Sequence, residues 1–222
     1  MLTVFILDRI CNLKCEFCIC NNEKRISTQT VKKKLDTCKE TIIFTGGEPL
    51  LRTDINELCQ YAKAKNLRVG INTNGLLIKR LDLFNIDFVN IPLDGRKQIN
   101  DLLRGKNHFS AAIYALELLK DNNIETKITT IATKLNLKEI KQIPKILSQF
   151  SNVTFWRVFK FKDNHKNLAE KFSITEEEFL KLKKDLSEIT TKFKIELIDD
   201  IDQFNNWEKI DSSGSTLIEQ TK

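Results

Sequence analysis

Short apolar runs alternate with segments of helical periodicity along most of the chain. Runs rich in β-branched and aromatic residues predict strands over residues 4–7, 41–44, 67–71, 88–91, 126–133 and 153–161. The apolar residues between these runs recur at helical spacing and predict helices over residues 27–38, 54–65, 109–120 and 137–150. Asp54 can cap the second of these helices. A last long helix is predicted to begin at Thr175, because Glu178 stands three residues on and completes a capping box.

Strands separated by helices of this length predict βαβ units, a parallel sheet and the α/β class. Six such units suit an open, partial (β/α)6 barrel rather than a flat doubly wound sheet, although spacing alone does not separate the two. The pattern weakens after Asp199, where residues 207–218 predict a terminal hairpin. We expect a single domain over residues 1–222, with its core at about 2–161 and a C-terminal helix and tail at 162–222.

Composition narrows the class of protein. The chain has 222 residues, of which 41% are hydrophobic and 30% are charged, as in soluble globular proteins. No apolar run approaches the ~20 residues that span a bilayer, and the first residues lack the pattern of a signal peptide. The net charge of +6 comes from lysines spread along the chain, so we expect no nucleic-acid binding. Six cysteines, three of them within eight residues, favour metal ligation in a reducing cytoplasm.

The candidate chemistry begins with Cys11, Cys15 and Cys18, a Cys-x3-Cys-x2-Cys run after the first predicted strand. Three thiolates leave one position of a metal site or cluster unfilled by protein, and a substrate can bind there. An iron–sulfur cluster is one interpretation. A zinc site is the other, because structural zinc takes four ligands and Cys20 could be the fourth.

Further polar or glycine-rich loops follow the next predicted strands. They read Gly46-Gly47-Glu48-Pro49, Asn72-Thr73-Asn74-Gly75 and Pro92-Leu93-Asp94-Gly95. Parallel strands of a barrel present their carboxyl ends to one mouth, so we expect these loops and the cysteines to converge there. Glycines without a Cβ allow the backbone to approach a ligand closely.

The cysteine spacing, the Gly-Gly-Glu-Pro loop and the Leu-Asp-Gly sequence resemble the radical S-adenosylmethionine (radical SAM) family over roughly residues 3–160. The resemblance favours the partial (β/α)6 barrel with a short C-terminal extension. It implies that Cys11, Cys15 and Cys18 ligate a [4Fe-4S] cluster whose fourth iron binds S-adenosylmethionine. It further implies reductive cleavage to a 5′-deoxyadenosyl radical that abstracts hydrogen from a substrate, with an electron donor such as flavodoxin or ferredoxin.

The resemblance also assigns residues to S-adenosylmethionine. Phe17 matches an aromatic position that packs near the adenine, and Glu48 would accept hydrogen bonds from the ammonium group. The residues expected to position the cofactor are Phe17, Gly46, Gly47, Glu48, Asn74 and Asp94. The family commonly has serine where this chain has Pro92, which removes a hydroxyl and a backbone donor.

The substrate is less readable. The sequence Trp156-Arg157-Val158-Phe159 resembles, over a short stretch, the viperin branch of the family, which acts on nucleoside triphosphates. Arg157 could bind a carboxylate or phosphate and Trp156 a ring; alternatively Trp156 is core and Arg157 a surface charge. No cysteine follows Cys59, unlike the cysteine-rich extensions of many peptide-modifying relatives, so a small molecule or nucleotide is favoured. Radical modification of a protein or peptide, and a non-enzymatic zinc- or cluster-binding module, are the alternatives.

Overall fold

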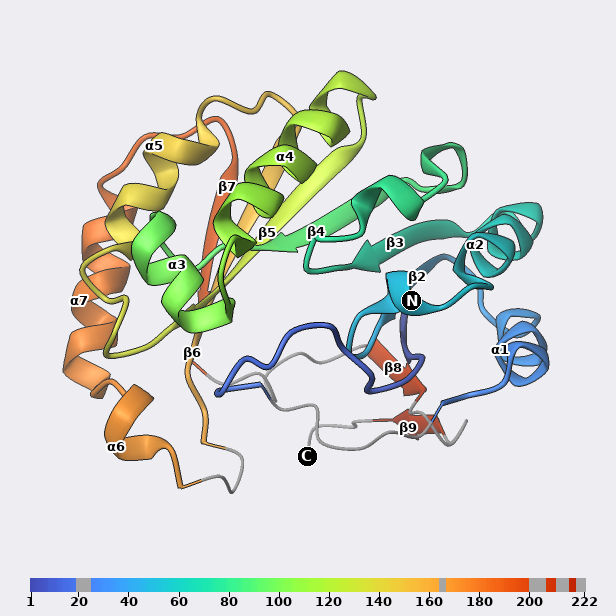
Figure 1. Cartoon of the computed structure of the whole chain (residues 1–222), viewed down its shortest axis with the longest axis horizontal. Coiled ribbons are helices and arrows are strands. Elements are labelled where there is room, and N and C mark those ends of the chain that lie inside the picture. Colours follow the sequence, from blue (N-terminus) through green and yellow to red (C-terminus); the bar gives the residue numbers. More distant parts are fainter. Residues whose placement is uncertain (19–24, 164–166, 200–206, 211–215, 219–222) are drawn as a thin grey trace. The chain divides into compact units, whose positions relative to one another are not determined.

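Strands and helices alternate along the chain, and this confirms the α/β class (Figure 1). The computed structural model describes residues 1–18, 25–163, 167–199, 207–210 and 216–218. The strands are β1 (Leu2–Ile6), β2 (Thr41–Thr45), β3 (Arg68–Asn72), β4 (Phe88–Pro92), β5 (Glu125–Ala132), β6 (Val153–Lys160), β7 (Lys194–Ile198), β8 (Trp207–Ile210) and β9 (Thr216–Ile218). The helices are α1 (Thr28–Leu35), α2 (Ile55–Ala64), α3 (Lys97–Arg104), α4 (His108–Asp121), α5 (Ile143–Leu147), α6 (Ala169–Phe172) and α7 (Glu176–Ser187).

The chain divides into two compact units, each made of separate segments. The first unit comprises residues 1–12, 20–90 and 204–222, and the second comprises residues 13–19 and 91–203. The boundary therefore crosses the cysteine loop between Asn12 and Leu13, and crosses β4 between Asn90 and Ile91. The organisation as one domain over residues 1–222 stays a prediction.

In the first unit, the carboxyl ends of the parallel strands β1, β2 and β3 lie level with one another, and β4 continues two residues further. Ile6 of β1 pairs with Thr45 of β2, and Asn72 of β3 pairs with Asn90 of β4. The helix α2 packs against β3, and α1 packs against α2. The strands bury apolar side chains such as Phe44. This register places the loops after β1, β2 and β3 at one edge of the sheet, as the sequence pattern predicted.

The predicted hairpin at residues 207–218 is confirmed. β8 and β9 pair in antiparallel fashion, and β8 also pairs with β1 in parallel. The far edge of β1 is thereby covered, so its backbone groups are bonded on both sides.

In the second unit, β5, β6 and β7 form a parallel sheet, and β5 and β6 bury the alternate residues of one face. Ile128, Thr130 and Trp156 lie on that face, while Thr129 and Arg157 lie half-buried on the other. α4 packs against β5, and α7 packs against β7 (Figure 1). The indole Nε1 of Trp156 donates a hydrogen bond to Thr130 Oγ1 at 2.9 Å, which satisfies the one polar atom of this buried side chain.

Some local expectations were wrong. The helix predicted over residues 137–150 is broken into a 3-10 turn at Ile140–Gln142 and the short α5, because Pro144 has no N–H to donate within a longer helix. The polar α3 and the short β7 were not predicted. Asp54 precedes α2 but makes no side-chain cap, because Arg52 and Thr28 bind its carboxylate. In the part of the chain that the structure describes, no helix is both long and apolar enough to cross a membrane.

The predicted capping box of α7 is confirmed and can be tested. Thr175 accepts from the N–H of Glu178 at 3.1 Å, and Glu178 accepts from the N–H of Thr175 at 2.8 Å. We expect Thr175→Ala to lower the free energy of unfolding by about 1 kcal/mol, because a backbone donor loses its partner. Urea unfolding measures this change. Thr175→Ser keeps the hydroxyl and should restore most of the loss; an equal loss in both variants would contradict the assignment.

Candidate active site

Gly46 and Gly47 lie directly against the backbone of the loop that carries Cys11. The N–H of Gly47 donates to Asp8 O at 2.9 Å, and the N–H of Glu48 donates to Ile10 O at 2.8 Å. A Cβ on Gly46 would lie 2.1 Å from Asp8 O, and a Cβ on Gly47 would lie 2.1 Å from Ile10 O. Only glycine fits such an approach. The close approach that the two glycines allow is therefore to the cysteine loop, and their contact with S-adenosylmethionine stays a prediction.

Glu48 is fully buried and joins the ends of β2 and β3. Its Oε1 accepts from the N–H of Leu50 at 2.9 Å and from Thr73 Oγ1 at 2.7 Å, and its Oε2 accepts from the N–H of Asn74 at 2.7 Å. Burial raises the pKa of Glu48, and these hydrogen bonds counteract only part of the rise. Glu48 thus accepts three hydrogen bonds from its own chain. Its contact with the ammonium group of S-adenosylmethionine stays a prediction.

Asn74 reaches from the end of β3 to the first cysteine. Its Nδ2 donates to Asn12 Oδ1 at 2.7 Å and lies 3.8 Å from Cys11 Sγ. Its Oδ1 accepts from the N–H of Leu76 at 3.0 Å, which fixes the orientation of the amide. An amide donor beside a ligating sulfur stabilises the negative charge of the thiolate. The structure therefore brings Asn74 together with Cys11, both residues that the sequence pattern singled out.

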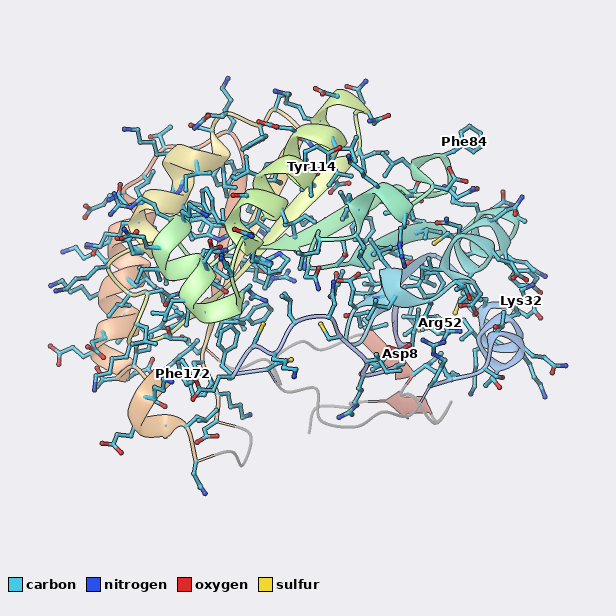
Figure 2. The ribbon with its side chains drawn as sticks, viewed as in Figure 1. Asp8, Lys32, Arg52, Phe84, Tyr114 and Phe172 are labelled. Atoms are coloured by element: carbon cyan, nitrogen blue, oxygen red, sulfur yellow. The ribbon has the colours of Figure 1, made fainter. Side chains whose placement is uncertain are left out.

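Cys15 and Cys18 belong to the second unit, where they close a tight turn. The N–H of Cys18 donates to Cys15 O at 3.0 Å. Between them, Phe17 is only 8% exposed and packs in a cluster with Leu103, Phe161 and Phe172. Phe172, labelled in Figure 2, meets the Phe17 ring edge-on with centroids 5.9 Å apart. Most of the Phe17 ring is thus covered by protein, and its contact with adenine stays a prediction.

Arg104, at the end of α3, is a site residue that the sequence pattern missed. Its Nε donates to Asp94 Oδ2 at 2.5 Å, and its guanidinium carbon lies 5.3 Å from the Phe17 ring centroid. Its carbonyl oxygen accepts from Cys15 Sγ at 3.7 Å. Burial lowers the pKa of Arg104, but the charges of Asp94, Cys15 and Cys18 outweigh burial, so the pKa lies above its usual value. A cation whose side chain is 13% exposed therefore lies near two of the three cysteines. The sequence pattern gave no indication of Arg104 because α3, the helix that carries it, was not predicted.

Asp94 is fully buried and held on several sides. Its Oδ1 accepts from the N–H of Ile131 at 2.8 Å, in addition to the ion pair with Arg104. Its own N–H donates to Asn100 Oδ1 at 3.0 Å, and its carbonyl accepts from Asn136 Nδ2 at 2.9 Å. Asp94 thus fixes Arg104 in place, and its direct contact with the cofactor stays a prediction.

The donor set fits an iron–sulfur cluster. Cys11, Cys15 and Cys18 are each half-buried, with an amide donor near the first and a cation near the other two. Both features stabilise thiolates. Among the described residues, no three His, Cys, Asp or Glu side chains gather around the position of one metal ion. A cluster spreads its thiolates over separate irons and does not require such a point. Cys20, the fourth ligand of the zinc interpretation, lies outside the described residues.

Trp156 and Arg157, the two residues considered for substrate contact, point to opposite faces of β6. Trp156 is fully buried, so the core interpretation holds for it and it offers no surface to a ring. Arg157 is half-buried; its Nε donates to Glu196 Oε2 at 2.7 Å, and its guanidinium carbon lies 4.9 Å from the Phe155 ring centroid. The charge of Arg157 is thus paired with a carboxylate on the neighbouring strand.

Comparisons with known proteins agree with these observations. The model of the radical SAM superfamily matches residues 5–146. Fe-coproporphyrin III synthase of Methanosarcina barkeri is 31% identical over 190 residues, which are 78% of this chain and 48% of that protein. Mycofactocin maturase MftC of Mycolicibacterium smegmatis is 32% identical over 159 residues, which are 65% of this chain and 41% of that protein. The chain therefore spans less than half the length of these two relatives.

Solved structures share the fold. The crystal structure of Streptococcus suis SuiB bound to S-adenosylmethionine has a TM-score of 0.78 and 16% sequence identity, over 97% of this chain and 59% of SuiB. SuiB bound to its precursor peptide SuiA has a TM-score of 0.79 at 15% identity, over 100% of this chain and 61% of SuiB. This likeness confirms the predicted partial (β/α)6 barrel.

The glycine contact with the cysteine loop yields a paired test. Gly47→Ala would drive a Cβ into Ile10 O, whereas Gly70→Ala would drive one into the Phe88 ring, far along the chain from the cysteines. We expect both variants to lose about 1–3 kcal/mol of unfolding free energy through overpacking. Only Gly47→Ala should also bind less iron after anaerobic reconstitution. Equal iron in the two variants would show that Gly47 does not hold the cysteine loop.

The raised pKa of Glu48 predicts a pH dependence of stability. The folded state binds the Glu48 proton more tightly than the unfolded state, in which the pKa is near its usual 4.5. The contribution of Glu48 to stability therefore falls as pH rises from about 4.5 through the raised pKa. Residue 48 does not titrate in Glu48→Gln, so wild type should lose stability relative to this variant as pH rises above 4.5. Urea unfolding across that range measures the difference, and a difference that grows in favour of wild type would contradict the pKa direction.

Proposed function

The chain belongs to the radical SAM superfamily, and we propose that it is an enzyme that holds a [4Fe-4S] cluster on Cys11, Cys15 and Cys18. Members of this superfamily are enzymes that use such a cluster with S-adenosylmethionine. When bound, these groups supply reductive cleavage of a sulfonium and removal of a hydrogen atom from a substrate. The observation that carries the proposal is the setting of the three thiols, with Asn74 beside the first and Arg104 facing the other two.

The chain's own residues hold and orient these groups. Gly46 and Gly47 fix the first part of the cysteine loop, and Asn74 donates toward Cys11. Arg104 Nε donates to Asp94. Within the described residues, this leaves the two terminal nitrogens of the guanidinium to bind a carboxylate. The carboxylate of the methionyl group of S-adenosylmethionine suits that place. Phe17 and Glu48 complete the proposed cofactor residues from the positions described above.

For the substrate we propose a small molecule. The 31% identity to a protein named Fe-coproporphyrin III synthase supports this class, because the name gives a porphyrin as product. The half-exposed face of β5, β6 and β7 carries Phe155, Arg157 and Glu196, which can contact a flat, charged molecule. A nucleotide has less support, since Trp156 is buried. An electron donor such as flavodoxin or ferredoxin and a reducing cytoplasm belong to the same proposal.

A peptide is the second candidate substrate. Its support is the similarity to MftC, which is named a maturase, and to the structure of SuiB bound to the precursor peptide SuiA. The two substrate classes share the same cysteine site, so a test of that site does not depend on the choice between them.

The cysteine assignment is tested by matched substitutions. We expect Cys15→Ala to lose most of its iron after anaerobic reconstitution, because one thiolate ligand is removed. Cys38→Ala is the control, since Cys38 is also half-buried but donates to the carbonyl of Lys34 at the end of α1. It should keep about four irons per chain, as should wild type. Iron, sulfide and zinc are counted in each protein.

Cys20→Ala separates the cluster from the zinc site. The proposal expects this variant to keep about four irons, because only three cysteines ligate the cluster. Bound zinc in wild type that is lost in Cys20→Ala would support the zinc-binding module. A Cys15→Ala protein with full iron content would overturn the ligand assignment.

A further inference from the structure

The loop that carries the three cysteines has a narrow neck. The chain leaves β1 through Leu7 and returns at Ile26, just before the Ser27 cap of α1. At the neck the N–H of Ile26 donates to Leu7 O at 3.0 Å. Both Leu7 and Ile26 are buried, whereas Cys11, Cys15 and Cys18 are half-buried. Cys11 lies in the same unit as the neck, so its position depends on how firmly the two sides of the neck are joined.

Arg52 binds both sides of this neck. Its Nη1 donates to Ile26 O at 2.9 Å and lies 3.5 Å from Leu7 O. The guanidinium is buried, with the side chain 2% exposed, so these bonds are shielded from water. Figure 2 shows Arg52 beside Asp8 and close to α1. One cation thus links the residue where the loop starts to the residue where it ends.

Asp54 holds the guanidinium in the orientation that this link needs. Its Oδ1 accepts from Arg52 Nε at 2.9 Å, and its Oδ2 accepts from Arg52 Nη2 at 2.6 Å. Thr28 Oγ1 donates to the same Oδ2 at 2.5 Å and ties Asp54 to the first turn of α1. This two-point contact explains why Asp54 does not cap α2. It also leaves Nη1 as the nitrogen that reaches the neck.

A second ion pair crosses the neck one residue further along the loop. Asp8, which is 1% exposed, accepts at Oδ2 from Arg25 Nε at 3.2 Å and at Oδ1 from the N–H of Ile10 at 3.2 Å. The carbonyl of Asp8 accepts from the N–H of Gly47. The neck is therefore joined at successive residues, and Arg52 is its buried cation, since the Arg25 side chain is 45% exposed.

We propose that Arg52 is a positioning residue for the iron site. Its side-chain bonds go to Leu7, Ile26 and Asp54 and not to the cysteines; it closes the neck of the loop and so limits where Cys11 can lie. Lysine cannot replace it, because one ammonium cannot bind both oxygens of Asp54 and also reach the carbonyls of the neck. The effect on the loop stands on the contacts described here, and the effect on iron rests on the proposed function.

The test uses Arg52→Lys, with Arg80→Lys as a matched control on an exposed arginine. Limited trypsin digestion of the iron-free proteins reports on the loop directly, because Arg9 and Lys14 are cleavage sites within it. We expect cleavage at these two sites to be about tenfold faster in Arg52→Lys, since losing a charge-assisted hydrogen bond changes an opening equilibrium by about that factor. Iron release to a chelator from the reconstituted protein should be faster as well, while Arg80→Lys matches wild type in both measurements.

Several outcomes decide the question. Unchanged cleavage at Arg9 and Lys14 in a folded Arg52→Lys protein overturns the proposal, and so does faster cleavage spread evenly over the whole chain. If Arg52→Lys does not fold, Asp54→Asn replaces it; this variant keeps one acceptor for the guanidinium and should show a smaller rise at the same two sites, and no rise overturns the proposal. Faster loop cleavage in proteins that bind no iron would support the closed neck while contradicting the proposed function.

Discussion

The contact between Gly46-Gly47 and the backbone of the cysteine loop is the constraint on which the rest of the site depends. Two carbonyl oxygens, of Asp8 and Ile10, occupy the space that side chains would fill. Because β1 and β2 pair in register, Ile6 and Thr45 end level and deliver the two loops to the same place. The glycines then allow the loops to approach within hydrogen-bond distance, and Cys11 follows directly. The contacts that Gly46-Gly47 makes within the chain therefore hold the loop that carries the cysteines.

The two buried carboxylates of the site also bind other parts of the same chain. Glu48 and Asp94 are both fully buried, and burial of a charge is costly unless partners compensate. Each is compensated by its own chain: Glu48 binds the end of β3, and Asp94 binds Arg104 and β5. Their main effect in the structure is to fix neighbours that face the cysteines. Arg104 then contributes a positive charge near Cys15 and Cys18, which stabilises their thiolates.

Much of the fold could be predicted from local signals. β-branched runs placed the first six strands, and the Thr175–Glu178 pair correctly marked the start of α7. What failed depends on tertiary contacts. The short α3 has Ile99, Leu102 and Leu103 at helical spacing, but this one turn of pattern stands among polar residues and was not used to predict a helix, so Arg104 was missed with it. Asp54 resembled a helix cap, but a guanidinium from outside the helix took its carboxylate. Trp156 resembled a substrate contact, but the alternation of strand β6 turns it into the core.

We propose that the three cysteines hold a cluster with which the protein cleaves S-adenosylmethionine. To test this, anaerobically reconstituted protein is reduced with dithionite, S-adenosylmethionine is added, and 5′-deoxyadenosine is quantified. We expect 5′-deoxyadenosine to form with wild type and not with Cys11→Ala. Zinc bound in place of iron, with no cleavage under these conditions, would show that the cysteines do not form such a site.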